Sequence, residues 1–303
     1  MFQKKFFAVI LIGIIFSSPQ IFLEKVFAVP NPEISPNVQW YWLKSDDKYS
    51  KYFDPDSVKV MKKAKTDSGR EVPTEIEAWT KTTYSPEGAA ETIKSYGISS
   101  ILPDPSILSY SLALFKINPQ TRMIQYARED FFNAKNQIIW SKTDGRVKEI
   151  NSQAFDEDFY AAIVDEVFRQ GEVERKNASD RWIELWNYTN KEGLTTNVSA
   201  DTTTMQLKGT NLILWEWQTT KNAEGQTVEI RFMKKAVNLS QGTEKISSGE
   251  VWDSNTKRWR DFDDENDGNY KMIENSSPEY KGLVRLRAYV KGYMNWVTRY
   301  AIR

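Results

Sequence analysis

Acidic side chains are the groups in this chain that could do chemistry, and the sharpest acidic pattern lies near the C-terminus. The run Asp263–Glu274 has acids at positions one, five and twelve of the calcium-loop pattern, and the turn glycine, Gly268, at position six. Glu265, at position three, departs from that pattern. The run Ser141–Lys148 carries an Asp-Gly dipeptide with a single acid, which hairpin-turn geometry alone explains. An ordinary acidic turn is therefore favoured over a calcium site, and no metal or cofactor is expected.

Pairs of neighbouring carboxylates are the second candidate chemistry. Glu129-Asp130 and Asp156–Asp158 are examples. Glycoside hydrolysis needs two carboxyl groups about 5 to 9.5 Å apart, and sequence proximity does not set that separation. No Gly-x-Ser-x-Gly, phosphate-binding loop or dinucleotide fingerprint accompanies the acids. A carboxylate-dependent periplasmic hydrolase acting on glycan therefore stays an alternative rather than the main interpretation.

The chain contains no histidine and no cysteine. Without histidine there is no Ser-His-Asp or Cys-His nucleophile and no imidazole metal ligand. Without cysteine there is no thiolate chemistry, iron–sulfur site or disulfide. We therefore predict that the protein is not an enzyme and has no catalytic residues.

Tryptophan pairs are the remaining candidates for recognition. Their members stand two or four residues apart in strand-like runs, so both members of a pair are expected on one sheet face. Paired indoles on an exposed face could bind sugar rings or a partner protein, since they offer large rigid contact area. Filling of the core is the favoured role for all three pairs: Trp40/Trp42, Trp182/Trp186 and Trp215/Trp217.

The first 28 residues have the pattern of a signal peptide. Lys4 and Lys5 precede an apolar run of eleven residues, and Ala28 closes a site of the kind that signal peptidase cleaves. Eleven residues fall short of the roughly 20 needed to span a bilayer as a helix. We expect cleavage after Ala28, and we expect that the mature protein is not an integral membrane protein. The alternative is that this segment is retained as a membrane anchor.

Charge and location limit the partners. The whole chain has 41 basic and 41 acidic residues, and cleavage would remove three lysines and one glutamate. A nucleic-acid partner is not expected, because phosphate binding normally requires a basic excess. A folded exported chain without disulfides is more typical of a bacterial envelope than of a eukaryotic secretory route. We expect an extracytoplasmic protein, in the periplasm or at the cell surface of a bacterium.

A faint internal repeat organises the mature chain. Thr121–Asn133 can be laid on Thr243–Asn255 at a constant offset, and both threonines and both asparagines match. Three upstream segments, Trp40–Trp42, Asp56–Val60 and Ile76–Trp79, correspond in the same order to Trp182–Trp186, Asp201–Met205 and Leu214–Trp217. The predicted organisation is a signal peptide (1–28) followed by two tandem units, 29–172 and 173–303.

Each unit is predicted to be a small sheet followed by a helix. Runs 110–117 and 228–232 read as strands. One helix is expected after Asp156, with Phe159 and Ile163 on its apolar face and Gly171 just past its end; another begins at Ser277-Pro278. The fold class is therefore α+β, with two tandem units, each an antiparallel β-sheet with a C-terminal packing helix.

The mature chain resembles a known family, and the resemblance covers both of its halves as two tandem copies. A tryptophan-bearing first strand, the turn Phe53–Val58 and a strand ending in Trp79 are similar to the surface-adhesin protein E-like domain of bacterial envelopes. The resemblance implies a small antiparallel sheet packed on a helix, a place at or near the cell surface, and binding of other proteins rather than catalysis. The founding adhesin has a cysteine pair, which this chain lacks, so no functional residue is carried over.

The C-terminal stretch carries an excess of basic residues. It could lie on an anionic membrane or an acidic polymer. A solvated helix face is favoured for its basic residues, Lys281, Arg285, Arg287, Lys291, Arg299 and Arg303.

The function we predict is non-enzymatic binding of an unknown protein or cell-surface ligand by an exported, adhesin-like envelope protein. The alternatives to this function are the hydrolase described above and a structural component of the envelope.

Overall fold

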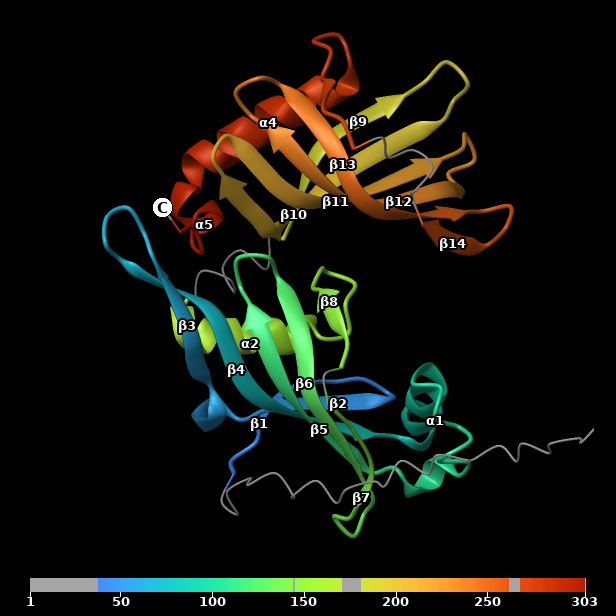
Figure 1. Ribbon diagram of the computed structural model, residues 1–303. Coiled ribbons are helices and arrows are strands. Elements are labelled where there is room, and N and C mark those ends of the chain that lie inside the picture. Colours follow the sequence, from blue (N-terminus) through green and yellow to red (C-terminus); the bar gives the residue numbers. More distant parts are fainter. Residues whose placement is uncertain (1–37, 144, 171–180, 262–267, 303) are drawn as a thin grey trace, which may run out of the picture. The chain divides into compact units, whose positions relative to one another are not determined.

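The computed structural model describes residues 38–143, 145–170, 181–261 and 268–302. The predicted signal peptide, the predicted boundary near residue 172 and the first acids of Asp263–Glu274 lie outside the described residues. The described chain is mostly antiparallel sheet, arranged as two sheets with few helices (Figure 1).

The first sheet has the strand order β1-β2-β4-β5-β6-β7, and every pairing in it is antiparallel. Two further strands pair at its margins, β3 with β4 and β8 with β6. Its elements are β1 (Tyr41–Ser45), β2 (Tyr49–Phe53), β3 (Lys59–Lys65), β4 (Glu71–Tyr84), α1 (Pro86–Ser95), β5 (Tyr110–Asn118), β6 (Met123–Phe132), β7 (Ile138–Thr143), β8 (Val147–Glu149) and α2 (Glu157–Phe168).

Alternation of side chains gives this sheet one strongly apolar face. In β4, Ile76 and Ala78 are fully buried, while Trp79 beside them is half-buried. The helix α2 packs Phe159 and Ile163 into the same core, and the ring of Phe159 lies 5.6 Å from that of Phe115 on β5. The strand predicted at 110–117 is confirmed. The strand expected to end at Trp79 instead continues to Tyr84.

The predicted glycine cap of α2 is wrong. The helix ends at Phe168, and Arg169 adopts the left-handed conformation (φ 54°, ψ 45°) that glycine was expected to supply. Its backbone N–H donates to the carbonyl of Asp165. A non-glycine residue in this conformation costs roughly 1–2 kcal/mol, which the closing hydrogen bond partly offsets.

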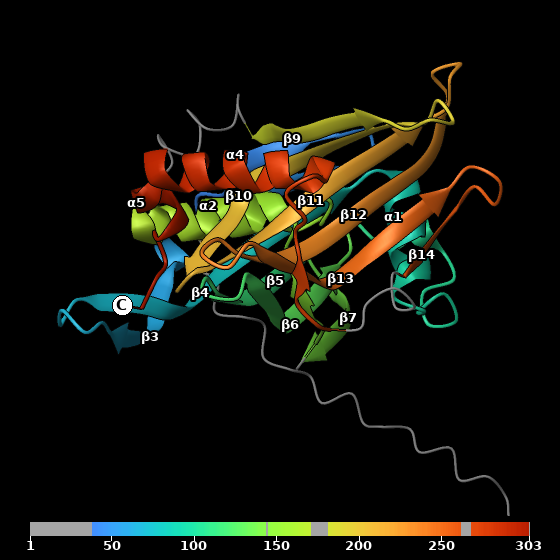
Figure 2. The same ribbon diagram turned by 90° about the horizontal axis from the view of Figure 1, so that it is seen from above.

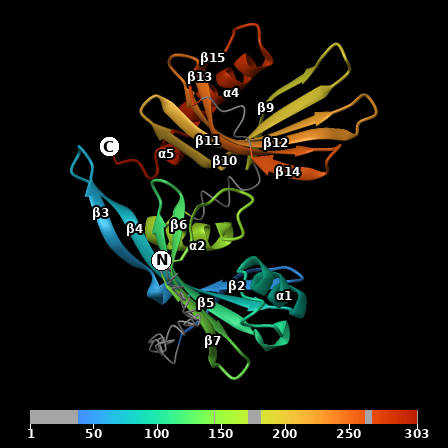
Figure 3. The same ribbon diagram turned by 45° about the vertical axis from the view of Figure 1, so that its right-hand side comes forward.

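The second sheet has the strand order β14-β13-β12-β11-β10-β9, and β15 pairs with β13. Figure 2 shows α4 lying along this sheet, and Figure 3 shows the edge strand β14 from another side. Its elements are β9 (Trp182–Thr189), β10 (Thr195–Lys208), β11 (Asn211–Lys221), β12 (Thr227–Asn238), β13 (Thr243–Asp253), β14 (Arg258–Asp261), β15 (Lys271–Met272), α4 (Pro278–Gly292) and α5 (Met294–Val297).

The C-terminal helix begins where the sequence predicts, with Ser277 at the cap position and Pro278 at the first helical position. The Ser277 hydroxyl makes no capping hydrogen bond in the described structure. Leu283 and Leu286 enter the core of the second sheet. Met294, beyond the helix end at Gly292, is exposed.

Bulges decide which tryptophans share a face. Trp186 pairs with Val198 and Glu184 pairs with Ser199, so Leu185 is an extra residue in β9. An extra residue reverses the side-chain alternation, which places Trp182 and Trp186 on opposite faces. The prediction that this pair shares a face is therefore wrong. Trp186 is buried under α4, whereas Trp182 is exposed.

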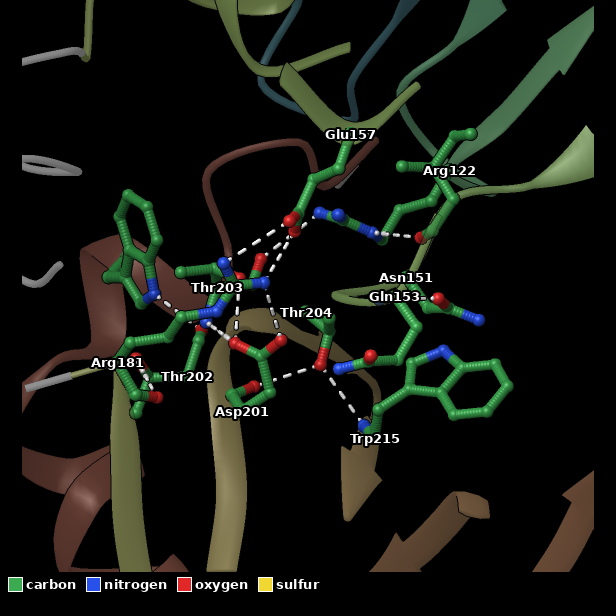
Figure 4. Close-up of polar contacts among 12 residues, drawn as sticks. Arg122, Asn151, Gln153, Glu157, Arg181, Asp201, Thr202, Thr203, Thr204 and Trp215 are labelled. Carbon is green, nitrogen blue, oxygen red and sulfur yellow. Dashed lines mark hydrogen bonds and ion pairs between the residues drawn. The ribbon is translucent and has the colours of Figure 1, made fainter. Parts of the chain in front are cut away.

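A polar cluster closes the bulged part of β10 (Figure 4). Asp201 is fully buried, and its carboxylate accepts hydrogen bonds from Arg181 (2.9 Å) and from the backbone and hydroxyl of Thr203 (3.0 and 2.7 Å). Thr203 in turn offers its carbonyl to Arg122 (3.1 Å) and Arg299 (2.7 Å). These groups bind one another, so the cluster holds the backbone in place and leaves Asp201 no room for a ligand.

Two side-chain truncations on α4 test this packing. We expect Leu286→Ala, which empties a buried position, to lower the free energy of unfolding by about 2–5 kcal/mol. Val284→Ala, at a half-exposed position of the same helix, should change it by about 0.5 kcal/mol or less. Urea unfolding followed by circular dichroism measures both, and equal losses in the two variants would contradict the assigned face of α4.

Candidate functional site

A pocket of about 230 Å³ lies on the covered face of the first sheet, between α1 and the start of α2. Strands β4, β5 and β6 form its floor. Hydroxyl, aromatic and charged side chains converge there, among them Tyr84, Tyr96, Ser111, Tyr126, Glu129, Arg146, Lys148 and Asp156. Convergent polar groups in a concave site are the ordinary mark of a binding or active site.

A bulge in β6 builds this pocket. Leu114 pairs with Arg128 and Phe115 pairs with Tyr126, so Ala127 has no partner of its own. Tyr126 and Glu129 are three positions apart and would lie on opposite faces of a regular strand. The extra residue brings both into the pocket. Regular alternation cannot predict this arrangement.

Glu129 is the central group of the pocket. Its side chain is buried, and the Tyr96 hydroxyl lies 2.7 and 2.6 Å from its two carboxylate oxygens, donating its proton to this group. The Arg146 guanidinium is 4.0 Å from Oε2. Burial raises the pKa of Glu129 to about 7, and the Tyr96 hydrogen bond and the Arg146 charge oppose that rise. Glu129 therefore changes charge near neutral pH.

Aromatic rings hold the Arg146 side chain in place. Its guanidinium lies over the rings of Tyr96 (4.4 Å) and Tyr126 (4.7 Å) and donates a hydrogen bond to the Tyr96 hydroxyl. Burial, with Glu129 beside it, raises the pKa of Tyr96. Tyr96 thus stays protonated and remains a donor to Glu129. Gly145 allows this approach, since a Cβ there would come within 2.9 Å of the Tyr126 carbonyl oxygen.

Asp156 also lines the pocket, but its carboxylate is already occupied. It is fully buried, accepts a hydrogen bond from the Tyr126 hydroxyl (2.7 Å) and forms an ion pair with Lys148. Its neighbours in the sequence point elsewhere: Glu157 binds Arg181, and Asp158 binds Lys51 at 2.9 Å.

The structure separates both carboxylate pairs that the sequence suggests. Asp130 lies on the other face of β6 from Glu129, where it binds Arg128 (2.7 Å) and Ser141 (2.6 Å). The pocket instead combines Glu129 with Asp156, which are 27 positions apart in the chain. Glu129 has a raised pKa and one hydrogen-bond donor among the described residues, Tyr96, so it is the carboxyl most able to engage a ligand.

The other residues singled out from the sequence do not converge. Arg285 binds Glu184 at 3.0 Å, Arg287 binds the Leu239 carbonyl at 2.7 Å, and Arg299 is buried. The part of the chain that the structure describes contains no cluster of three acidic residues placed to hold a metal ion. The preference for an ordinary acidic turn over a calcium site at Asp263–Glu274 stays a prediction, because Asp263 and Asp267 lie outside the described residues.

Comparisons with known proteins give no family for this chain: no family model, curated protein or solved structure matches it. None of the helices formed by the described residues is long and apolar enough to cross a membrane.

The raised pKa of Glu129 predicts a pH-dependent stability. The folded state holds the Glu129 proton more tightly than the unfolded state, whose pKa is near 4.5. The free energy of unfolding therefore falls as the pH rises from about 4.5 to about 7, by an amount on the order of 3 kcal/mol, and is level above that range. Glu129→Gln keeps an acceptor for Tyr96 but has no charge to bury, so it should lose this slope. Urea unfolding at pH 5, 6, 7 and 8 measures it.

Glu71→Gln is the matched control, since Glu71 is half-exposed and pairs with the surface residue Lys63. It should retain the wild-type slope. Parallel pH profiles for wild type and Glu129→Gln would show that Glu129 is not the titrating group.

Proposed function

We propose that the protein is an exported, non-enzymatic binding protein of the bacterial envelope, and that the Glu129 pocket receives an uncharged polar side chain of a partner protein. The observation that carries the proposal is the Glu129–Tyr96–Arg146 arrangement. It offers a carboxyl group, a hydroxyl and a guanidinium at one concave place. Such groups recognise hydroxyls and amides, which both donate and accept hydrogen bonds.

The charges of the pocket favour an uncharged ligand. Lys148 is paired with Asp156, and Arg146 lies near Glu129, so the cationic and anionic groups balance. An ionic ligand would have to leave water without a free counter-charge to receive it. A serine, threonine, asparagine or glutamine side chain meets no such cost.

Binding is favoured over glycoside hydrolysis for a geometric reason. Hydrolysis by two carboxyl groups requires both to reach the substrate. Asp156 is fully buried, with partners on both oxygens, and cannot do so. Glu129 could act as the proton donor, but this pocket then offers no second carboxyl group to act as nucleophile or base.

The proposed location rests on sequence features alone, whereas the proposed tandem copies are also supported by the two sheets. The signal-like first 28 residues and the resemblance to the surface-adhesin protein E-like domain favour export to the envelope. Both sheets place six successive strands in the same spatial order, with only the β3 hairpin added in the first. In each sheet a short strand also pairs with the start of the fifth strand in this order, and a helix follows that short strand. In the first sheet Glu149 of β8 pairs with Met123 of β6, and in the second Met272 of β15 pairs with Thr243 of β13. This agreement supports tandem copies at 29–172 and 173–303.

Ligand binding to the mature chain (29–303) tests the proposed function. Saturation-transfer NMR with the N-acetyl amides of serine, threonine, asparagine and glutamine should detect binding of at least one. Tyr96→Phe removes the hydroxyl from this arrangement, and the loss of one hydrogen bond to the ligand, worth about 0.5–1.5 kcal/mol, should weaken that binding about two- to tenfold. Tyr188→Phe, at an exposed position of the second sheet, is the control and should bind as wild type does.

Two results would overturn the proposal. One is the absence of binding by all four amides. The other is Glu129-dependent cleavage of a chromogenic glycoside, lost in Glu129→Gln, which would make the hydrolase the better interpretation.

A further inference from the structure

One face of the second sheet carries no helix in the described structure and gathers aromatic residues. Strand register shows which side chains share it. Trp217 pairs with Phe232, Phe232 with Glu250, and Glu250 with Asp261, so these four form one row across β11, β12, β13 and β14. Side chains paired directly across a sheet point to the same face. The next row on this face holds Thr219, Ile230, Trp252 and Trp259.

The aromatic rings of these rows form a continuous series. Trp215 stacks on Phe232 with ring centres 4.5 Å apart, Phe232 lies 5.7 Å from Trp217, and Trp217 lies 6.1 Å from Trp259. Trp215 (7% exposed) and Phe232 (3%) are buried, whereas Trp259 at the other end is 44% exposed. The series thus runs from a buried end to an open end. The opposite face, which carries Leu214 and Val237, is the one that α4 covers.

A cavity of about 380 Å³ lies at the buried end of the series. Its volume is within the roughly 300–1,000 Å³ of small-molecule sites. Trp215 and Phe232 contribute apolar walls, and Asn151, Gln153 and Ser248 contribute uncharged polar groups. Figure 4 shows Asn151 and Gln153 beside the indole of Trp215.

Three polar groups at this cavity are unused by the protein itself. The Trp215 Nε1 is buried and has no acceptor among the residues that the structure describes. Within the same described ranges, the carboxylates of Glu250 and Asp261 have no side-chain partner, although both line the cavity. A buried N–H without a partner is costly, so a ligand that supplies an acceptor there would be stabilised.

We infer that this face is a carbohydrate-binding cleft for a neutral pyranose oligosaccharide. Sugar rings present C–H faces that pack on indoles, and hydroxyls that donate to carboxylates and accept from amides and from an indole N–H. One ring enters the cavity, and the following rings lie over Trp217 and Trp259. An acidic sugar is disfavoured by Glu250 and Asp261, since like charges repel there. This cleft is independent of the Glu129 pocket, which lies on the other sheet.

Isothermal titration calorimetry of the mature chain with four neutral hexasaccharides tests the inference: maltohexaose, cellohexaose, chitohexaose and mannohexaose. At least one should bind with a Kd between about 10 μM and 1 mM. Trp259→Ala and Glu250→Gln, both at exposed positions, should each weaken that binding about fivefold or more. A cooperative urea transition at the wild-type midpoint confirms that each variant is folded.

Two control variants show whether the sugar binds at this cleft or elsewhere on the protein. Trp42→Ala removes another exposed tryptophan, on the first sheet, and should bind as wild type does. Glu129→Gln should also leave glycan binding unchanged, which distinguishes failure of this inference from failure of the proposed function. The inference is overturned if none of the four sugars binds, or if binding survives both Trp259→Ala and Glu250→Gln undiminished.

Discussion

Partial coverage of a wide sheet by narrow helices is the constraint on which the rest of this structure depends. Six strands span about 24 Å, whereas a helix with its side chains is about 10 Å across. In the first sheet α2 covers Ile76, Phe115 and Ile117, and the surface that it leaves becomes the Glu129 pocket. In the second sheet α4 occupies one face, and the aromatic series lies on the other. Both candidate sites therefore occupy sheet surface that a helix leaves uncovered.

Burial of polar groups follows from the same constraint. A partly covered sheet has a border where apolar packing ends and water is still excluded, and polar residues there must bind one another. Glu129 and Asp156 occupy such a border and differ in outcome. Asp156 forms an ion pair with Lys148 and accepts a hydrogen bond from the Tyr126 hydroxyl. Glu129 accepts a hydrogen bond from the Tyr96 hydroxyl and lies 4.0 Å from the Arg146 guanidinium, and burial raises its pKa.

The sequence predicted those elements that depend on local periodicity. The strand at 110–117, the helix after Asp156 and the helix start at Ser277-Pro278 all follow from side-chain spacing and capping residues, and the structure contains each. The same spacing also indicated correctly that antiparallel sheet would be combined with a few helices. Tandem duplication and envelope location remain proposals.

The Glu129 pocket could not be predicted because an irregularity in a strand creates it, whereas Trp215 and Trp217 share one face, as their spacing predicts. Leu185 and Ala127 are extra residues in β9 and β6, and each reverses the side-chain alternation on which facing arguments rely. Trp182 and Trp186 therefore do not share a face as predicted, whereas Tyr126 and Glu129 lie on the same face. Arg169 likewise takes a backbone conformation for which glycine was expected, because the hydrogen bond to Asp165 closes the helix early.

The bulge at Ala127 has a consequence for how such a pocket can arise or be lost. Tyr126 and Glu129 meet because one residue is present between them that the neighbouring strand does not match. Deletion of that residue would leave every pocket side chain in the sequence, yet would turn Glu129 to the opposite face of β6. The site is thus encoded by the number of residues in a strand as much as by their identities. Related chains that conserve these side chains but differ in length by one residue here would not share the pocket.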